Sequence, residues 1–254
     1  MIKYKYQKAT VINRPSKIIK SPYMVDILYD DNEYLAHSPA LSLNKLINNG
    51  TIIMISESDN DKTSRKSKYT IEFVKLDKIW IGVNPLFANK LFIHCVNNKI
   101  LTEFDGYFLK KAEIKTKNGR LDFLLHNKDN DIGVVTPTKE YFVEIKNVPL
   151  AKDNVAIFPF GKKNKKTDIY ISERAYKHLK ELILLKKHGF NVALVFIIQR
   201  NDIEYLIPNY EHDYKYAKTL EKAYKLGVNI YAYKFNVKSN NIQFMTRIPI
   251  NFIN

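Results

Sequence analysis

Cysteine is nearly absent from this sequence. Cys95 is the only cysteine in 254 residues, which excludes an internal disulfide and a zinc site made of several cysteines. It lies among the apolar residues Leu91, Phe92 and Val96. Because a free cysteine in such surroundings is usually buried, we expect Cys95 in the core and expect no disulfide-linked partner.

Long apolar runs are also missing. No stretch approaches the ~20 residues that span a bilayer, and the charged start Met1–Tyr6 is not followed by an apolar signal segment. We therefore expect a cytoplasmic protein that does not insert into a membrane. Hydrophobic residues still make up 45% of the chain, which is enough for a core. The length of 254 residues allows one large domain or two modest ones.

Acidic residues are too few to balance the basic ones. The chain has 41 Lys and Arg against 26 Asp and Glu, for a net charge of +15. Such an excess favours polyanionic partners, nucleic acid first and anionic membrane second. A biased genome composition would give the same charge without any such partner. A homo-oligomer is compatible with the sequence, which does not fix the oligomeric state.

The first part of the chain is typical of a small β-barrel. Residues 23–29, 50–55 and 69–76 are β-rich runs separated by polar stretches, a spacing that predicts short strands of a barrel. Residues 41–47 fit one short helix. Asn84-Pro85 then predicts a helix N-terminus, with the helix running to about Asn97. We place the domain boundary here, with a barrel over residues 1–83 and a second domain over residues 84–254.

The second part predicts a mixed α/β domain. Strands are expected at 109–117, 120–126, 141–148, 192–198 and 228–235. Helices are expected from Ser172 to about His188 and from Asp213 to Gly227. The wholly apolar run at 192–198 is typical of a strand buried on both faces. Strands that alternate with helices in this way imply parallel crossover connections. The fold class is therefore α/β (α+β), a barrel followed by a mixed sheet flanked by helices.

Glu144-Ile145-Lys146 is the most informative motif. Side chains alternate along a strand, so Glu144 and Lys146 leave the same face. Asp122 lies in an earlier apolar run, Arg120–Leu125. An acid on one strand and Glu-x-Lys on a later strand is the arrangement of metal-dependent nucleases. The plain alternative is the wet face of a half-buried sheet, on which Glu-x-Lys is common.

A predicted hairpin adds a third carboxylate. With Asn118-Gly119 as a two-residue turn, Lys115 pairs with Asp122, and Glu113 pairs with Leu124. Glu113 and Asp122 then become diagonal neighbours about 7–8 Å apart on one face. Convergence with Glu144 requires the later strand to lie beside this hairpin.

Phosphodiester hydrolysis suits this residue set. A hard cation offsets negative charge and acidifies a bound water, and Mg²⁺ is commonly held by one or two carboxylates together with waters and substrate phosphate. We expect Asp122 and Glu144 to hold Mg²⁺ (or Mn²⁺). Lys146 would orient the water and stabilise charge, and Glu113 would assist.

The chain resembles the sugar fermentation stimulation protein A family. The resemblance covers nearly the whole sequence and is strongest in ordered stretches of the second half: residues 119–125, 142–148, 156–159, 172–182 and 195–200. It implies an N-terminal OB-like barrel joined to a PD-(D/E)XK nuclease-type domain. It also implies DNA binding, with a regulatory role in sugar metabolism proposed for bacterial members. Under it, Asp122, Glu144 and Lys146 match the nuclease motif and Glu113 matches its earlier acid.

The chain departs from the family pattern at a few positions. Leu121 stands in place of the proline in the motif's name. Phe160 and Gly161 follow where an Asp is usual, with a basic insertion to Lys166, and Ala175 replaces a usual Gly.

Further residues are candidates for contacting nucleic acid. Arg174 and His178 share a helix face that we expect to point away from the apolar stripe. Gln199 and Arg200 end a buried strand, and such ends border ligand crevices in α/β sheets. A basic segment could bind phosphates; its candidates are Lys162, Lys163, Lys165 and Lys166. A solvated helix face and a solvated loop are the alternatives.

Three functions are consistent with these features. The first is a DNA-binding, Mg²⁺-dependent nuclease. The second is a DNA-binding regulator that keeps the nuclease fold without cleaving. The third is an RNA-binding protein that works through the barrel, where tyrosines could stack on bases.

Overall fold

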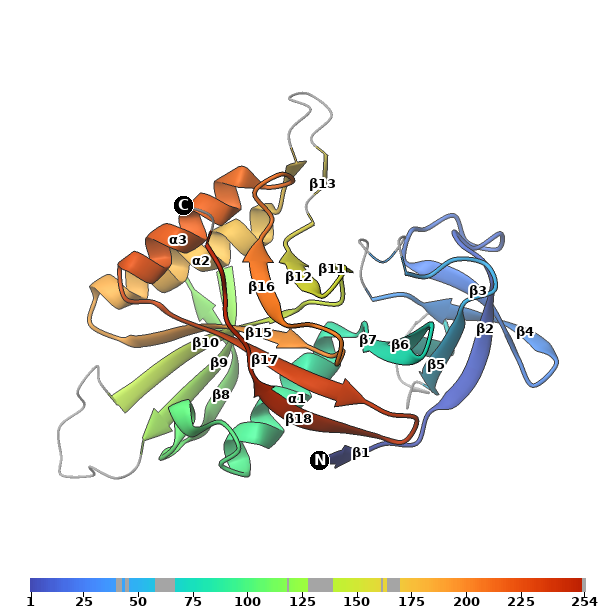
Figure 1. Cartoon of the computed structure of the whole chain (residues 1–254), viewed down its shortest axis with the longest axis horizontal. Helices are drawn as coiled ribbons and strands as arrows, with labels where there is room; N and C mark the ends of the chain where they lie inside the picture. Colours follow the sequence, from blue (N-terminus) through green and yellow to red (C-terminus); the bar gives the residue numbers. More distant parts are fainter. Residues whose placement is uncertain are drawn as a thin grey trace.

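The computed structural model describes residues 1–39, 43, 46–57, 67–117, 119–127, 139–160, 162–163 and 170–252, with only the backbone described at 162, 163, 170 and 171. Figure 1 shows a barrel on one side, in blue, and a larger sheet with helices on the other. No helix within the described ranges is long and apolar enough to cross a bilayer.

The N-terminal part is a closed five-stranded barrel, as the sequence predicts. Its strands are β2 (Gln7–Asn13), β3 (Met24–Tyr29), β4 (Asn32–His37), β5 (Ile52–Glu57) and β6 (Tyr69–Leu76). The order β4-β3-β2-β5-β6 closes through a parallel β4–β6 pairing, which is the strand arrangement of an OB-like barrel. β7 (Ile79–Gly82) continues antiparallel from β6. The short helix expected at 41–47 falls largely outside the described residues.

The larger part is built on a seven-stranded mixed sheet. Its strands are β1 (Ile2–Lys3), β8 (Tyr107–Thr116), β9 (Gly119–Asn127), β10 (Glu140–Asn147), β15 (Asn191–Ile198), β17 (Asn229–Val237) and β18 (Asn241–Arg247). The order is β1-β18-β17-β15-β10-β9-β8. β10, β15 and β17 pair in parallel, which confirms the predicted crossovers. β1 pairs with β18, so the chain starts in this sheet before it enters the barrel.

Helices cover both faces of the sheet. α1 (Pro85–Asn97) packs with one core cluster, and α2 (Glu173–Lys187) and α3 (Tyr214–Lys225) pack with the other. The predicted caps form at Asn84 and Asp213, whose side chains accept hydrogen bonds from Leu86 N and Tyr216 N. Ser172 makes no such bond.

Several short elements were not predicted. They are η2 (Thr102–Phe104), the three-stranded sheet of β11 (Ala151–Lys152), β12 (Val155–Phe158) and β16 (Tyr205–Pro208), and the pair β13 (Lys162–Lys163) and β14 (Tyr170–Ile171). Strands of this length carry too little periodicity to be recognised.

The predicted register of the β8–β9 hairpin is wrong. Lys115 pairs with Arg120 instead of Asp122, and Lys111 instead of Glu113 pairs with Leu124. An Asn-Gly hairpin turn needs a positive φ at the glycine. Gly119 is not among the positive-φ glycines and pairs with Thr116 as the first residue of β9. Gly119 therefore belongs to the strand and not to the turn, and the pairing of β8 with β9 is shifted by two residues from the predicted one.

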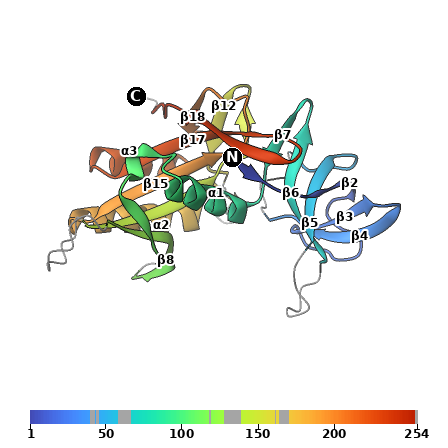
Figure 2. The ribbon, with the colours of Figure 1, turned by 90° about the horizontal axis from the view of Figure 1, so that it is seen from below.

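The barrel and the sheet are in close contact (Figure 2). Met54, Phe73 and Trp80 of the barrel side belong to the same core cluster as α1 and one face of the sheet. Gly82 N donates to Gln199 O at 2.9 Å, and Asn147 Nδ2 donates to Gly82 O at 3.1 Å. The end of β7 is thus bonded to residues at the carboxyl ends of β10 and β15, close to the Glu144 motif.

Candidate active site

Asp122 lies where two strands of the large sheet part. The β9–β10 pairing runs from His126 with Glu140 to Phe123 with Val143. Beyond it, Asp122 Oδ2 accepts the backbone N–H of Ile145 at 2.8 Å. Asn89 of α1 donates to Asp122 Oδ1 at 3.2 Å. The carboxylate therefore accepts the N–H that a strand carbonyl would otherwise accept, and it is fixed by one donor from β10 and one from α1.

Glu144 lies on the neighbouring strand with only 2% of its side chain exposed. Its Oε1 accepts a hydrogen bond from Lys146 Nζ and contacts Nδ1 of His178 on α2. Its Oε2 is buried and has no hydrogen-bond partner within the described parts of the chain. The same-face prediction for Glu144 and Lys146 is confirmed, and one oxygen of Glu144 remains available to a ligand.

The two acids have pKa values displaced in opposite directions. Burial and the charge of Glu144 raise the pKa of Asp122, against the Ile145 N–H bond. Burial also raises that of Glu144, but the nearby Lys146 and His178 outweigh it and lower the pKa of Glu144 to about 2. Both groups repel each other as anions, which is the condition that a bound cation relieves.

The residues fit a hard divalent cation. Two adjacent carboxylates supply oxygen donors, and the unpartnered Glu144 Oε2 is the kind of atom that a metal would satisfy. No group of three or more His, Cys, Asp or Glu with metal-binding geometry occurs among the described residues. Two carboxylates are nevertheless a common set of protein ligands for Mg²⁺, whose other ligands are waters and substrate oxygens.

Glu113 lies near Asp122. Both residues line a cavity of about 470 Å³ beside α1. Glu113 has a φ of 52°, which is uncommon for a residue with a side chain. Its carboxylate pairs with Arg120 at 2.8 Å and is 72% exposed. Glu113 is therefore an exposed residue beside Asp122, and its carboxylate forms an ion pair with Arg120.

Gln199 and Arg200 are placed differently from the expectation. They are 0% and 4% exposed, so they do not offer a surface to nucleic acid. Gln199 Nε2 donates to Asn147 Oδ1 at 2.9 Å, and Arg200 bonds Asp202 and Pro149 O. These bonds hold the two side chains at the junction with the barrel, while Gln199 Oε1 is buried without a hydrogen-bond partner among the described residues.

Arg174 and His178 share a helix face, but that face does not point wholly to solvent. His178 is only 6% exposed because its ring turns toward Glu144. Arg174 is exposed. Both line a pocket described below. Of the basic segment, the structure describes only the backbone of Lys162 and Lys163 in β13. Lys165 and Lys166 lie outside the described residues.

Sequence reasoning missed two contacts of the site. Asn89 on α1 orients Asp122, and His178 contacts Glu144. Asn89 gives no local signal, since its role depends on α1 packing against β9 and β10. For His178 the signal was available, because a histidine on an amphipathic helix that covers the Glu144 strand is close to the acid.

Comparisons with known proteins agree with this architecture. The family model "Sugar fermentation stimulation protein RE domain" matches residues 86–241. A sugar fermentation stimulation protein homolog of Caldanaerobacter subterraneus is 32% identical over 87% of this chain and 88% of its own. One of Geotalea uraniireducens is 31% identical over 95% of each chain. A solved structure of Pyrococcus furiosus SfsA in complex with Ca²⁺ has a TM-score of 0.82 at 20% identity, covering 98% of both chains.

Proposed function

Since the chain belongs to the sugar fermentation stimulation protein family, we propose that it binds DNA and hydrolyses phosphodiester bonds with a divalent cation. The observation that carries the proposal is the placement of Asp122, Glu144 and Lys146. They come together where β9 and β10 part, and Glu144 Oε2 has no hydrogen-bond partner among the residues that the structure describes.

Asp122 and Glu144 are proposed to hold the cation. Ca²⁺, which accompanies the Pyrococcus furiosus protein of the same fold, prefers oxygen ligands as Mg²⁺ and Mn²⁺ do. When bound, the cation would supply charge stabilisation at the phosphate and an acidified water. We favour Mg²⁺ or Mn²⁺ for activity, because two carboxylates leave coordination positions for water and substrate.

The surrounding side chains are proposed to fix and assist these acids. Lys146 has three N–H donors. One of them goes to Glu144 Oε1, and the others can orient a water or neutralise a phosphate oxygen. Asn89 and the Ile145 N–H hold the Asp122 carboxylate in place. His178 does the same for Glu144. Preorganised groups of this kind reduce the reorganisation needed during reaction.

DNA is the proposed substrate. The net charge of +15 favours a polyanion, and lysine and arginine contacts to phosphates give binding that weakens with salt. A flat response of DNA binding to salt would exclude phosphate contacts as its main source.

A cleavage assay tests the function. Single-stranded, duplex and branched DNA, and RNA of the same sequence, are incubated with the protein and Mg²⁺ or Mn²⁺. We expect cleavage of DNA, and a loss of at least about 100-fold in Asp122→Asn and Lys146→Ala, the scale of removing a preorganised electrostatic group. Lys187→Ala, an exposed change at the end of α2, is the matched control.

The outcomes separate the alternatives. DNA binding without cleavage of any substrate favours a regulator that keeps the nuclease fold. Preference for RNA favours the third function. Cleavage that survives Asp122→Asn unchanged contradicts the proposed site.

A further inference from the structure

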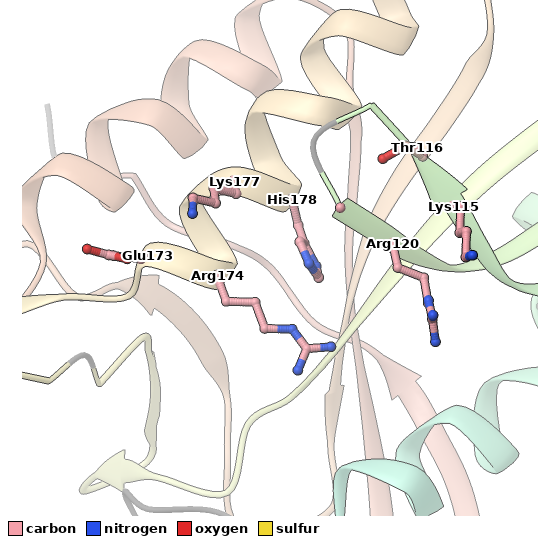
Figure 3. Close-up of a pocket in the computed structure, with 8 residues that line it drawn as sticks. Lys115, Thr116, Arg120, Glu173, Arg174, Lys177 and His178 are labelled. Carbon is pink, nitrogen blue, oxygen red and sulfur yellow. The ribbon is translucent and has the colours of Figure 1, made fainter.

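A basic pocket lies beside the acid pair, between the β8–β9 hairpin and the first turns of α2. Its volume is about 630 Å³, and the residues that matter here are Lys115, Arg120, Glu173, Arg174, Lys177 and His178. In Figure 3 the side chains of Arg174, His178 and Arg120 extend in a similar direction, whereas Glu173 points away from them. We call this space the basic pocket.

The charge of the basic pocket is strongly one-sided. Four cations line it, with Glu173 as the only acid among the lining residues. Arg120 is partly neutralised by Glu113. Lys115, Arg174 and Lys177 form no ion pair within the part of the chain that the structure describes. Gathering like charges in one place is unfavourable unless an anion offsets them.

The cations Arg174 and Lys177 come from the first turns of α2, which begins at Glu173. At this helix terminus the Ser172 N–H donates to Asp213 Oδ2 at 2.7 Å, so an acid already lies there. The side chains, and not the helix terminus, therefore give the pocket its preference for an anion.

His178 connects the basic pocket to the proposed catalytic acids. Its ring lines the pocket, and its Nδ1 contacts Glu144 Oε1. Only one side chain therefore separates the pocket from Glu144. If a nucleic-acid strand binds at the acids, the phosphate next to the bound one on the His178 side is directed toward the basic pocket.

We propose that the basic pocket binds phosphate groups of the nucleic-acid strand next to the bond that is cut. The position of that bond rests on the proposed function. The unpaired charge exceeds what one phosphodiester offsets. It matches either two successive backbone phosphates or a terminal phosphate, which carries ≈ −1.5 to −2.

A binding experiment with the full chain tests this. Anisotropy of a labelled oligonucleotide is measured in EDTA, so that no cleavage occurs, across a range of salt concentrations. The variants are Arg174→Ala, Lys177→Ala and their combination, with Lys187→Ala on the same helix as control. We expect the double variant to lose at least about tenfold in affinity at low salt and its salt slope to fall by about 2. The control should bind within twofold of the unchanged protein.

Two oligonucleotides distinguish the sources of the phosphate. One carries a 5′-phosphate and the other a 5′-hydroxyl. Tighter binding of the first, lost in the double variant, assigns the pocket to a terminal phosphate. Equal binding of both, weakened in the double variant, assigns it to backbone phosphates.

A double variant that binds both oligonucleotides like the unchanged protein overturns the proposal. Arg174 and Lys177 are exposed, so their replacement leaves packing intact, and Lys177→Glu gives a second test by charge reversal. Because the assay contains no divalent cation, its result is independent of whether the protein cuts DNA.

Discussion

Asp122, which is half-buried, and Glu144, which is buried, are two acids whose charges are influenced in opposite ways. Lys146 and His178 stabilise the charge on Glu144, while burial and Glu144 itself disfavour the charge on Asp122. Acids with perturbed pKa values are typical of functional sites. Such sites often lower the stability of the fold, because their residues are placed for activity. This contrast leads to different expectations for the two residues.

Replacing Asp122 with Asn should stabilise the protein while removing activity. The raised pKa of Asp122 means that its ionised form at pH 7 opposes folding. Asn keeps an oxygen for the Ile145 N–H, and the Asn89 amide can turn over so that its oxygen accepts from the new NH2 group. We expect the free energy of unfolding to rise by on the order of 1 kcal/mol at pH 7. The gain should shrink as pH falls and the original Asp122 takes up a proton. Urea unfolding in EDTA measures this, and a less stable Asp122→Asn would contradict it.

Glu144→Gln should destabilise the protein at neutral pH. The pKa of Glu144 is lowered to about 2 from an ordinary 4.5, so the ionised form favours the folded state. This contribution to stability is fully present at pH values above 4.5, the pKa in the unfolded chain. It is lost as the pH falls from 4.5 to about 2, the pKa in the folded protein. We expect a loss of roughly 3 kcal/mol at pH 7, since each pKa unit corresponds to about 1.4 kcal/mol.

Urea unfolding between pH 2 and 7 checks this prediction. Glu144→Gln should show a weaker fall in stability toward acid than the unchanged protein. Glu57→Gln is the control, since Glu57 is an exposed partner of Lys68, and its effect should stay below about 0.5 kcal/mol. Equal acid sensitivity of Glu144→Gln and the unchanged protein would count against the assigned ion pair.

At the scale of elements, features that depend on a few neighbouring residues are predictable from the sequence, and features that depend on distant contacts are not. The start of α1 at Pro85 follows from Asn84, whose side chain caps the helix. The period of two places Glu144 and Lys146 on one face within a single strand. The β8–β9 register depends instead on the backbone of Gly119, and the burial of Gln199 depends on contact with the barrel. Neither is encoded within a few residues.

The junction between barrel and sheet depends on Gly82. A Cβ there would lie 2.3 Å from Gln199 Oε1, and Gln199 is 0% exposed. We expect Gly82→Ala to cost about 1–3 kcal/mol of stability through overpacking. Gly119→Ala is the control, since the Cβ there would lie 3.8 Å from the His178 ring, an ordinary contact distance, and Gly119 needs no positive φ.

Thermal and urea unfolding of both variants measure the difference. Gly119→Ala should stay within about 0.5 kcal/mol of the unchanged protein. Equal stability of Gly82→Ala and Gly119→Ala would show that the junction adjusts without loss.

At the scale of the whole molecule, the composition predicted a class of partner and the family resemblance predicted the architecture. The closed barrel and the parallel β10-β15-β17 core confirm the architecture, and the class of partner stays a prediction. The return of β1 to the large sheet was not predictable, because a two-residue strand has no pattern. The basic pocket was also not predictable from the sequence, since its cations come from a hairpin and a helix that are distant in sequence.

The central claim is that Asp122 and Glu144 together hold a divalent cation. Anomalous scattering from crystals of the protein soaked in Mn²⁺ tests it most directly, with Asp122→Asn crystals treated in the same way. We predict a strong anomalous peak between the two carboxylates in the unchanged protein and a weak or missing one in Asp122→Asn. No peak at these carboxylates, or an equal peak in both crystals, would contradict the account.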